Sequence, residues 1–178
     1  FHSLQDKFPS GKLYSSVFGN NTVSSEFEAI TGISTAFTDR GADIYTNYAT
    51  TDLYNIGDYY KEFGYSKGII HACNKENYNR MNVYNNMSYD KMIFLEDFNT
   101  DVESIRTFIS DKTNFKYVSD LVRDTEEPLF LLNITIQNHS QYNEKVELEH
   151  SIEINNTNNK FRETENYLSL LRESDKEL

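Results

Sequence analysis

The chain of 178 residues is 25% charged and 38% hydrophobic, a composition typical of one globular domain and unlike that of repeat, collagen-like or disordered proteins. Its 17 basic and 28 acidic side chains give a formal charge of −11, which argues against nucleic acid and anionic membrane surfaces as partners. The longest apolar stretch, Pro128 to Leu132, is too short to span a membrane, so we expect these residues to be soluble. A single cysteine, Cys73, excludes an internal disulfide and a thiolate metal site.

Both ends of the chain suggest that it is part of a larger protein. It starts at Phe1 without an initiator methionine or an apolar leader, and residues 161–178 predict a helix that is still running when the sequence stops. We therefore expect residues 1–178 to be a single partial domain, truncated at both ends.

The first predicted elements are a strand and a helix joined by a short turn. Residues 12–18 are typical of a strand. Ser25 and Glu28 have the spacing of a helix capping box, Ile30 lies on the apolar face that follows, and Gly32 would end the helix.

A second helix and a buried strand are predicted next. Thr51 or Asp52 would cap the helix and Gly64 would stop it. Residues 66–71 are typical of a short buried strand. The apolar stripe of this helix would consist of Leu53, Ile56, Tyr60 and Phe63.

The second half of the chain predicts further helices and one clear strand. Residues 78–86 are compatible with a helix, and residues 111–122 place four apolar side chains on one helical face: Phe115, Val118, Leu121 and Val122. Residues 128–136 form a nearly continuous apolar run, which is typical of a central strand covered on both faces. This alternation of strands and helices predicts an α/β sandwich with a mainly parallel sheet.

Open α/β sheets bind ligands beyond the carboxyl ends of their strands. Three polar side chains follow predicted strands: Thr22 after the first, His71 at the end of the second and His139 after the third. We therefore expect all three to share one edge of the sheet.

Thr22 lies between a predicted strand and the amino end of a helix. Unpaired backbone N–H groups and the positive end of the helix dipole attract an anion such as phosphate there, and a neighbouring hydroxyl can serve as a metal-activated nucleophile. The alternative is a turn or capping threonine.

The other candidate residues suit the recognition of a phosphate group. The guanidinium of Arg80 matches two phosphate oxygens and Tyr78 could flank it, although a surface arginine paired with an acid is the alternative. His139 could donate to a phosphoryl oxygen or protonate a leaving group, or be held by loop backbone. His71 is a weaker candidate of the same kind. Glu26 and Glu28 lie two apart on a helix, so they face different ways and form no carboxylate dyad.

Taken in order, these motifs resemble the lipoteichoic acid synthase family, a group of phosphoglycerol transferases within the sulfatase and alkaline phosphatase superfamily. Residues 19–32 resemble the family's nucleophile motif, and residues 64–84 resemble its substrate-phosphate segment. Residues 128–139 resemble its strand with a histidine, and residues 167–175 resemble the helix that follows.

The resemblance implies an alkaline phosphatase-like three-layer sandwich and a metal-dependent transferase on the extracellular face of the cell membrane. Such an enzyme moves glycerol phosphate from a phosphatidylglycerol-type lipid to a growing cell-envelope polymer or glycan, and the membrane link would lie in a missing amino-terminal region. By resemblance, Thr22 is the nucleophile and a metal ligand, Arg80 and His139 bind phosphate oxygens, Tyr78 is their aromatic neighbour and His71 lies at the pocket margin.

The metal implied by the resemblance is manganese or magnesium, and both are hard ions that suit phosphoryl chemistry. The family's metal site also uses an acidic residue upstream of the nucleophile and a distant downstream Asp-His pair, and only Thr22 of this set is matched here. We therefore expect these 178 residues alone neither to hold metal tightly nor to turn over.

Two other functions are compatible with the sequence. One is a related phosphodiesterase or sulfatase-type hydrolase, although sulfatases need Cys or Ser where this chain has Thr22. The other is a catalytically silent surface module that binds glycerol phosphate polymer or a protein partner.

Overall fold

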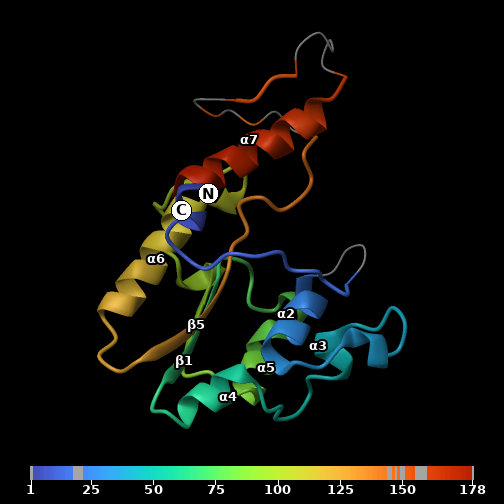
Figure 1. Ribbon diagram of the computed structural model, residues 1–178, viewed down its shortest axis with the longest axis vertical. Coiled ribbons are helices and arrows are strands. Elements are labelled where there is room, and N and C mark those ends of the chain that lie inside the picture. The colour runs from blue at the N-terminus through green and yellow to red at the C-terminus, as the bar shows by residue number, and fades with distance from the viewer. Residues whose placement is uncertain are drawn as a thin grey trace.

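A parallel sheet of three strands forms the centre of the protein, and helices lie on both of its sides (Figure 1). The strands, in the spatial order β2–β1–β5, are Lys91–Phe94, Ser66–His71 and Leu129–Ile134. This arrangement confirms the predicted α/β class. The structure is a computed structural model that describes residues 2–17, 22–143, 146, 148, 151–154 and 160–177.

One face of the sheet is covered by short helices from the first half of the chain. Val23, Phe27 and Ile30 of the first of them belong to the larger apolar cluster, together with Tyr45 and Tyr84. Because all five are almost fully buried, this cluster fixes the helical layer against β1. The helices are α2 (Thr22–Thr31), α3 (Ile44–Asn47), α4 (Ile56–Lys61) and α5 (Arg80–Asn86).

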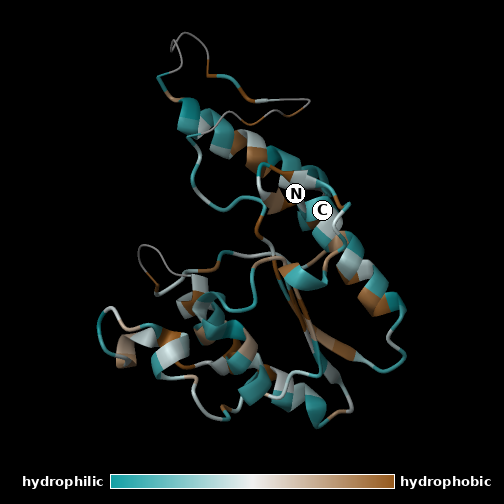
Figure 2. Cartoon of the chain, turned by 180° about the vertical axis from the view of Figure 1, so that it is seen from behind, coloured by the Kyte–Doolittle hydropathy of each residue, from teal (hydrophilic) through white to brown (hydrophobic). Residues whose placement is uncertain are grey.

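The opposite face packs against α6 (Asp111–Arg123), which contacts α7 (Arg162–Glu177) in turn. A small antiparallel hairpin, β3 (Ser104–Ile105) and β4 (Phe108–Ile109), precedes α6. Figure 2 shows hydrophobic residues on the strands between the two helical layers. The remaining short elements are α1 (His2–Gln5), η1 (Thr35–Phe37), η2 (Asn77–Asn79) and η3 (Leu95–Asp97).

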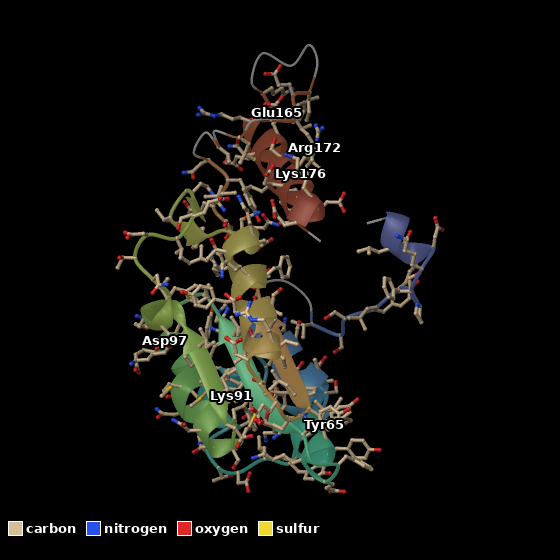
Figure 3. All side chains as sticks on the ribbon, turned by 90° about the vertical axis from the view of Figure 1, so that its left-hand side faces the viewer. Tyr65, Lys91, Asp97, Glu165, Arg172 and Lys176 are labelled. Carbon is tan, nitrogen blue, oxygen red and sulfur yellow. The ribbon has the colours of Figure 1, made fainter. Side chains whose placement is uncertain are left out.

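Parallel pairing brings the carboxyl ends of the strands to one edge of the sheet. His71 of β1 is in register with both Phe94 of β2 and Ile134 of β5. This edge faces the part of the molecule that carries α7, whereas Tyr65, just before β1, lies at the opposite end (Figure 3). Within the described residues, every helix is too short or too polar to cross a bilayer.

The predicted strand over residues 12–18 is wrong for the residues that the structure describes. Residues 12–17 have no strand structure, and Phe18 lies outside the described part of the chain. Leu13 and Tyr14 are 95% and 86% exposed, so their apolar side chains bury nothing and no neighbouring strand pairs with them. The helix that follows begins earlier than predicted, at Thr22, so Ser25 lies inside it, whereas Gly32, with φ of +71°, ends it as expected.

The second predicted helix begins later than its pattern indicates. Asn55, rather than Thr51 or Asp52, is the N-cap of α4 and accepts from the N–H of Gly57. Asp58 completes a capping box by accepting from the N–H of Asn55. The predicted stripe is also wrong in part, because Ile56 and Phe63 are 42% and 63% exposed.

The order of the strands differs from the prediction. β1 coincides with the predicted strand, but β1 and not β5 is the central strand of the described sheet. The apolar run of β5 nevertheless packs on both faces, since Leu132 and Ile134 contact one cluster and Leu131 the other. The apolar run of β5 therefore indicated that both faces are covered, but it did not indicate the position of β5 in the sheet.

The predicted helices of the second half are observed with small shifts. α6 ends one residue beyond its predicted range, and α7 lies within its predicted range. Val122 is 54% exposed, so it does not belong to the buried face of α6 as predicted. α5 begins at Arg80, because Tyr78 and Asn79 adopt left-handed backbone angles just before it.

Candidate active site

A cavity of about 270 Å³ opens at the carboxyl edge of the sheet. It is lined by Thr22, His71, Tyr78, Arg80 and His139, the five residues singled out in the sequence. The chemical roles assigned to them stay predictions, but the fold brings all five side chains to one space. The other residues that line it are Cys73, Asn77, Ile134, Thr135, Ile136 and Asn138.

Three segments meet at this cavity. β1 ends at His71, and β5 ends at its register partner Ile134, so the loops after both strands leave from the same edge. α2 begins at Thr22, whose side chain is exposed, and the first-turn N–H groups of a helix have no partner within the helix. A hydroxyl and an anion-attracting helix end therefore stand beside the side chains of the strand ends.

Arg80 is buried at the cavity wall, only 3% exposed, and is held by a carboxylate from α2. Its Nη2 donates to Oε1 of Glu26 at 2.6 Å, and its Nε donates to Oε2 of Glu26 at 3.2 Å. The surface-pairing alternative for Arg80 is therefore replaced by a buried, two-point ion pair. The spacing of Glu26 in the sequence indicated only that it forms no dyad with Glu28, and gave no sign of this ion pair.

The two glutamates of α2 do face different ways, as predicted. Glu26 is buried with Arg80, whereas Glu28 accepts hydrogen bonds from Ser34 and Thr35 at the other side of the helix. Ser16 also donates to Glu28. The hydrogen bond from Ser16, followed by those from Thr35, lowers the pKa of Glu28 to about 2.

Two tyrosine hydroxyls complete the environment of Glu26. Tyr45 and Tyr84 each donate to Oε2 of Glu26 at 3.1 Å, and both side chains are fully buried. Burial raises the pKa of both phenols, and the Glu26 charge adds to this, so that both remain protonated donors at neutral pH.

The aromatic neighbour expected for Arg80 is present. The Tyr78 ring lies 5.2 Å from the Arg80 guanidinium carbon and is half exposed at the cavity mouth. The left-handed backbone at Tyr78 and Asn79 turns the chain sharply between β1 and α5, and it thereby places Tyr78 and Arg80 on the same cavity.

The two cavity histidines differ in burial. His71 is 3% exposed, and its Nδ1 donates to the carbonyl of Ile134 at 2.9 Å, which leaves Nε2 as the free nitrogen. Burial, and after it the positive charge of Arg80, lower the pKa of His71, so its imidazole is neutral at pH 7 and Nε2 is an acceptor. His71 therefore offers the cavity a hydrogen-bond acceptor rather than a positive charge.

His139 is exposed and stands on the loop after β5. Its Nδ1 donates to the carbonyl of Ser140 at 2.7 Å, which leaves Nε2 for a ligand. Arg106, on the β3–β4 turn, donates to the carbonyls of Gln137, His139 and Gln141 and so holds this loop. A second cavity of about 530 Å³ adjoins the first through His139 and is lined by Arg106 and Gln141.

The described residues do not fit the metal that the resemblance implies. Within them, no three His, Cys, Asp or Glu side chains lie close enough together to hold an ion. Glu26 cannot serve, because both of its oxygens are occupied by Arg80 and the tyrosines. The described residues therefore do not form a metal centre by themselves.

The comparison with protein families decides the ancestry of the chain. The sequence model of the sulfatase family matches residues 3–178. The chain belongs to the sulfatase family. This sulfatase-family chain is also 30% identical, over 132 residues, to a candidate cyclic beta-1,2-glucan modification protein of Rhizobium meliloti (strain 1021). That match covers 74% of the chain and 20% of the relative, so the chain spans about a fifth of the relative's length.

Solved structures show where this sulfatase-family fold recurs. The Streptococcus pyogenes phosphoglycerol transferase GacH, in complex with sn-glycerol-1-phosphate, superposes with a TM-score of 0.77 and 24% identity over 99% of this chain and 47% of its own. The Listeria monocytogenes lipoteichoic acid synthase LtaP gives a TM-score of 0.73 with 18% identity, covering 92% of this chain and 40% of its own.

A third structure broadens the comparison. A Vibrio parahaemolyticus protein of the alkaline phosphatase superfamily matches with a TM-score of 0.63 and 18% identity, covering 88% of this chain and 38% of its own. At these identities the likeness shows the fold, and it confirms the predicted resemblance and the alkaline phosphatase-like architecture. The chain spans less than half of each of these structures.

Proposed function

We propose that this chain is part of a phosphoglycerol transferase that moves glycerol phosphate from a phosphatidylglycerol-type lipid to a cell-envelope polymer or glycan. The observation that carries the proposal is the single cavity in which the Thr22 hydroxyl, the Arg80 guanidinium and the His139 imidazole meet. The structural likeness to a phosphoglycerol transferase and a lipoteichoic acid synthase supports the same substrate class.

The proposed reaction has two displacement steps. Thr22 Oγ forms a bond to the lipid phosphorus while the bond from phosphorus to the diacylglycerol oxygen breaks, and diacylglycerol leaves with the proton that Thr22 gives up. An acceptor hydroxyl then forms a bond to the same phosphorus, the bond to Thr22 breaks, and the acceptor's proton returns to the threonine. No oxidant or reductant is needed.

The remaining cavity groups position the phosphate in this scheme. The first-turn N–H groups of α2 and the Arg80 N–H groups that Glu26 does not use bind the phosphate oxygens. His139 contacts an oxygen through Nε2, and the neutral His71 accepts from a glycerol or threonine hydroxyl. Tyr78 closes the cavity mouth beside the guanidinium.

The acceptor would enter from the second cavity. That cavity adjoins the first at His139, and its polar lining of hydroxyl and amide side chains beside Phe108 suits a polyhydroxylated acceptor. The sequence relative named for glucan modification supports a glycan in this role.

The cofactor and location follow from the same proposal. The intact gene product would use manganese or magnesium, with Thr22 as one ligand, and would act at the extracellular face of the cell membrane. Most of the metal ligands would come from outside the described residues.

The test replaces Thr22 in the intact gene product. We expect Thr22→Ala to lower diacylglycerol release from phosphatidylglycerol by about 10³-fold or more, because no covalent intermediate can form. Mass spectrometry of the wild-type protein after exposure to the lipid should show a glycerophosphoryl group on the peptide that contains Thr22. Ser25→Ala, an exposed hydroxyl within the same helix, is the matched control and should retain activity.

Other outcomes separate the alternatives. If Thr22→Ala turns the lipid over at the wild-type rate, the enzyme reading fails and a binding module remains. If free glycerol phosphate is the product even with acceptor glycan present, the protein is a hydrolase of the same superfamily.

A further inference from the structure

Glu26 does not line the cavity, yet it is a buried carboxylate that accepts from Arg80, which does. Its Oε1 accepts from Arg80, and its Oε2 accepts from Arg80, Tyr45 and Tyr84. With 7% exposure and four hydrogen bonds from Arg80, Tyr45 and Tyr84, the carboxylate is held by these partners and does not face the cavity. Its place in the fold calls for a role that acts through Arg80.

The geometry of the pair leaves one end of the guanidinium open. Glu26 takes the Nε–H and one N–H of Nη2, whereas Nη1 makes only a long contact of 3.5 Å with the carbonyl of Asn77. Because Arg80 lines the cavity, the N–H groups that Glu26 does not use are the ones available to a ligand.

The pair also joins two segments that are far apart in the chain. Glu26 stands one helical turn after Thr22 on α2, so the two residues share a face of that helix. Arg80 is the first residue of α5, 54 positions later. The ion pair therefore ties the helix that begins at the proposed nucleophile to the proposed phosphate-binding cation.

We propose that Glu26 is the positioning residue that fixes the orientation of Arg80 relative to Thr22, with Tyr45 and Tyr84 holding the carboxylate in place. The inference rests on the proposed function of the cavity. It also specifies how phosphate is recognised: since Glu26 offsets the charge of Arg80, the guanidinium acts through directed hydrogen bonds more than through net positive charge.

A double-mutant cycle on the intact gene product tests this role. The readouts are the Kd for sn-glycerol-1-phosphate by calorimetry and the turnover of phosphatidylglycerol. We expect Arg80→Ala to raise Kd by about tenfold or more and Glu26→Gln by about fivefold. The double variant should bind within about twofold of Arg80→Ala, because Glu26 acts only through Arg80.

Glu28→Gln is the matched control. It makes the same chemical change on the same helix, but its partners Ser34 and Thr35 do not line the cavity. Its Kd should stay within about twofold of the wild type. A purely structural role for Glu26 would lower the melting temperature without this dependence on Arg80.

The outcomes are distinguishable. A Glu26→Gln variant that binds like the wild type, or whose loss adds in full to that of Arg80→Ala, overturns the positioning role and leaves the proposed function standing. If Arg80→Ala itself changes neither Kd nor turnover, the proposed function fails. Should Glu26→Gln not fold, Tyr84→Phe keeps the ion pair and removes one hydroxyl from Glu26. Tyr84→Phe should raise the Kd by about twofold, and only when Arg80 is present. An unchanged Kd in this variant would overturn the positioning role.

Discussion

At the scale of single residues, burial decides what each cavity side chain can do. His71 and His139 each donate from Nδ1 to a backbone carbonyl and differ mainly in exposure. The buried His71 is kept neutral, whereas the exposed His139 is free to meet a ligand. The sequence pattern placed both histidines at strand ends but did not distinguish their environments, because burial depends on the surrounding helices.

The buried His71 predicts a specific dependence of stability on pH. Its pKa in the folded protein is lowered from an ordinary value of 6.5, first by burial and then by Arg80, while Glu26 and the Ile134 carbonyl act in the opposite sense. Between 6.5 and the lower folded value the unfolded chain binds more protons, so stability is full above this window and falls as the pH drops through it.

Urea unfolding at a series of pH values measures this effect. We expect the free energy of unfolding to decline from about pH 6.5 downward, before most carboxylates protonate. His71→Asn retains a donor for the Ile134 carbonyl and removes the titrating group, so its decline over this window should be smaller. An unchanged slope would show that another group is responsible.

At the scale of elements, the β3–β4 hairpin supports the loop that carries His139. Arg106 donates to three carbonyls of this loop and lies 5.1 Å from the Phe108 ring, which itself packs against His139. A two-residue strand pair thus acts as a brace for a candidate catalytic loop. Neither β3 nor β4 was predicted, because two residues are too few to give a period.

The brace can be tested by removing its guanidinium. We expect Arg106→Ala to lower phosphatidylglycerol turnover by about tenfold, because the loop after β5 loses three hydrogen bonds and His139 loses its fixed position. Arg123→Ala, which removes an exposed arginine that pairs with Asp120 and Asp124 on the surface, is the control and should be neutral. Equal activity of the two variants would contradict the brace.

The local sequence pattern predicted some elements well. It failed where a pairing strand or a capping side chain determines whether an element forms and where it begins. β1 coincides with its prediction: Ile69 and Ile70 are fully buried, as the short apolar pair between turn signals indicated. Residues 12–17 have a strand-like pattern but no partner, and a pattern cannot supply one. In α4 the Asn55 cap determined the start because its side chain satisfies the first turn, whereas Thr51 and Asp52 have no such geometry.

At the scale of the whole molecule, the sequence predicted which side chains meet in one cavity better than it predicted the residues that support them. His71 and the loop that carries His139 reach one cavity because the parallel strands β1 and β5 end at one edge, a rule that holds without knowledge of side chains. Thr22 reaches the same cavity from the start of α2, although residues 12–17 form no strand before it. Glu26 was missed because its partner lies 54 positions away. The available signal was its position one turn after Thr22, on the same helical face.

The metal affinity of the isolated chain is a prediction at this scale. Manganese and magnesium require several oxygen ligands, and the described residues gather no such set around Thr22. We expect calorimetry with manganese chloride on the 178-residue chain to show only weak binding by the acidic surface. A micromolar site would refute this expectation, and Thr22→Ala would show whether that site includes the hydroxyl.

The register of β1 with β5 has a consequence for cooperativity. His71 and Ile134 are paired across the ladder and also through the His71 ring, so the floor of the cavity is a part of the sheet itself. A phosphate group held there would bridge α2, the strand β1 and the loop after β5. Because the cavity is built from all three segments, local unfolding of any one of them would disrupt it. Loss of phosphate binding and unfolding of the core would therefore occur in the same transition.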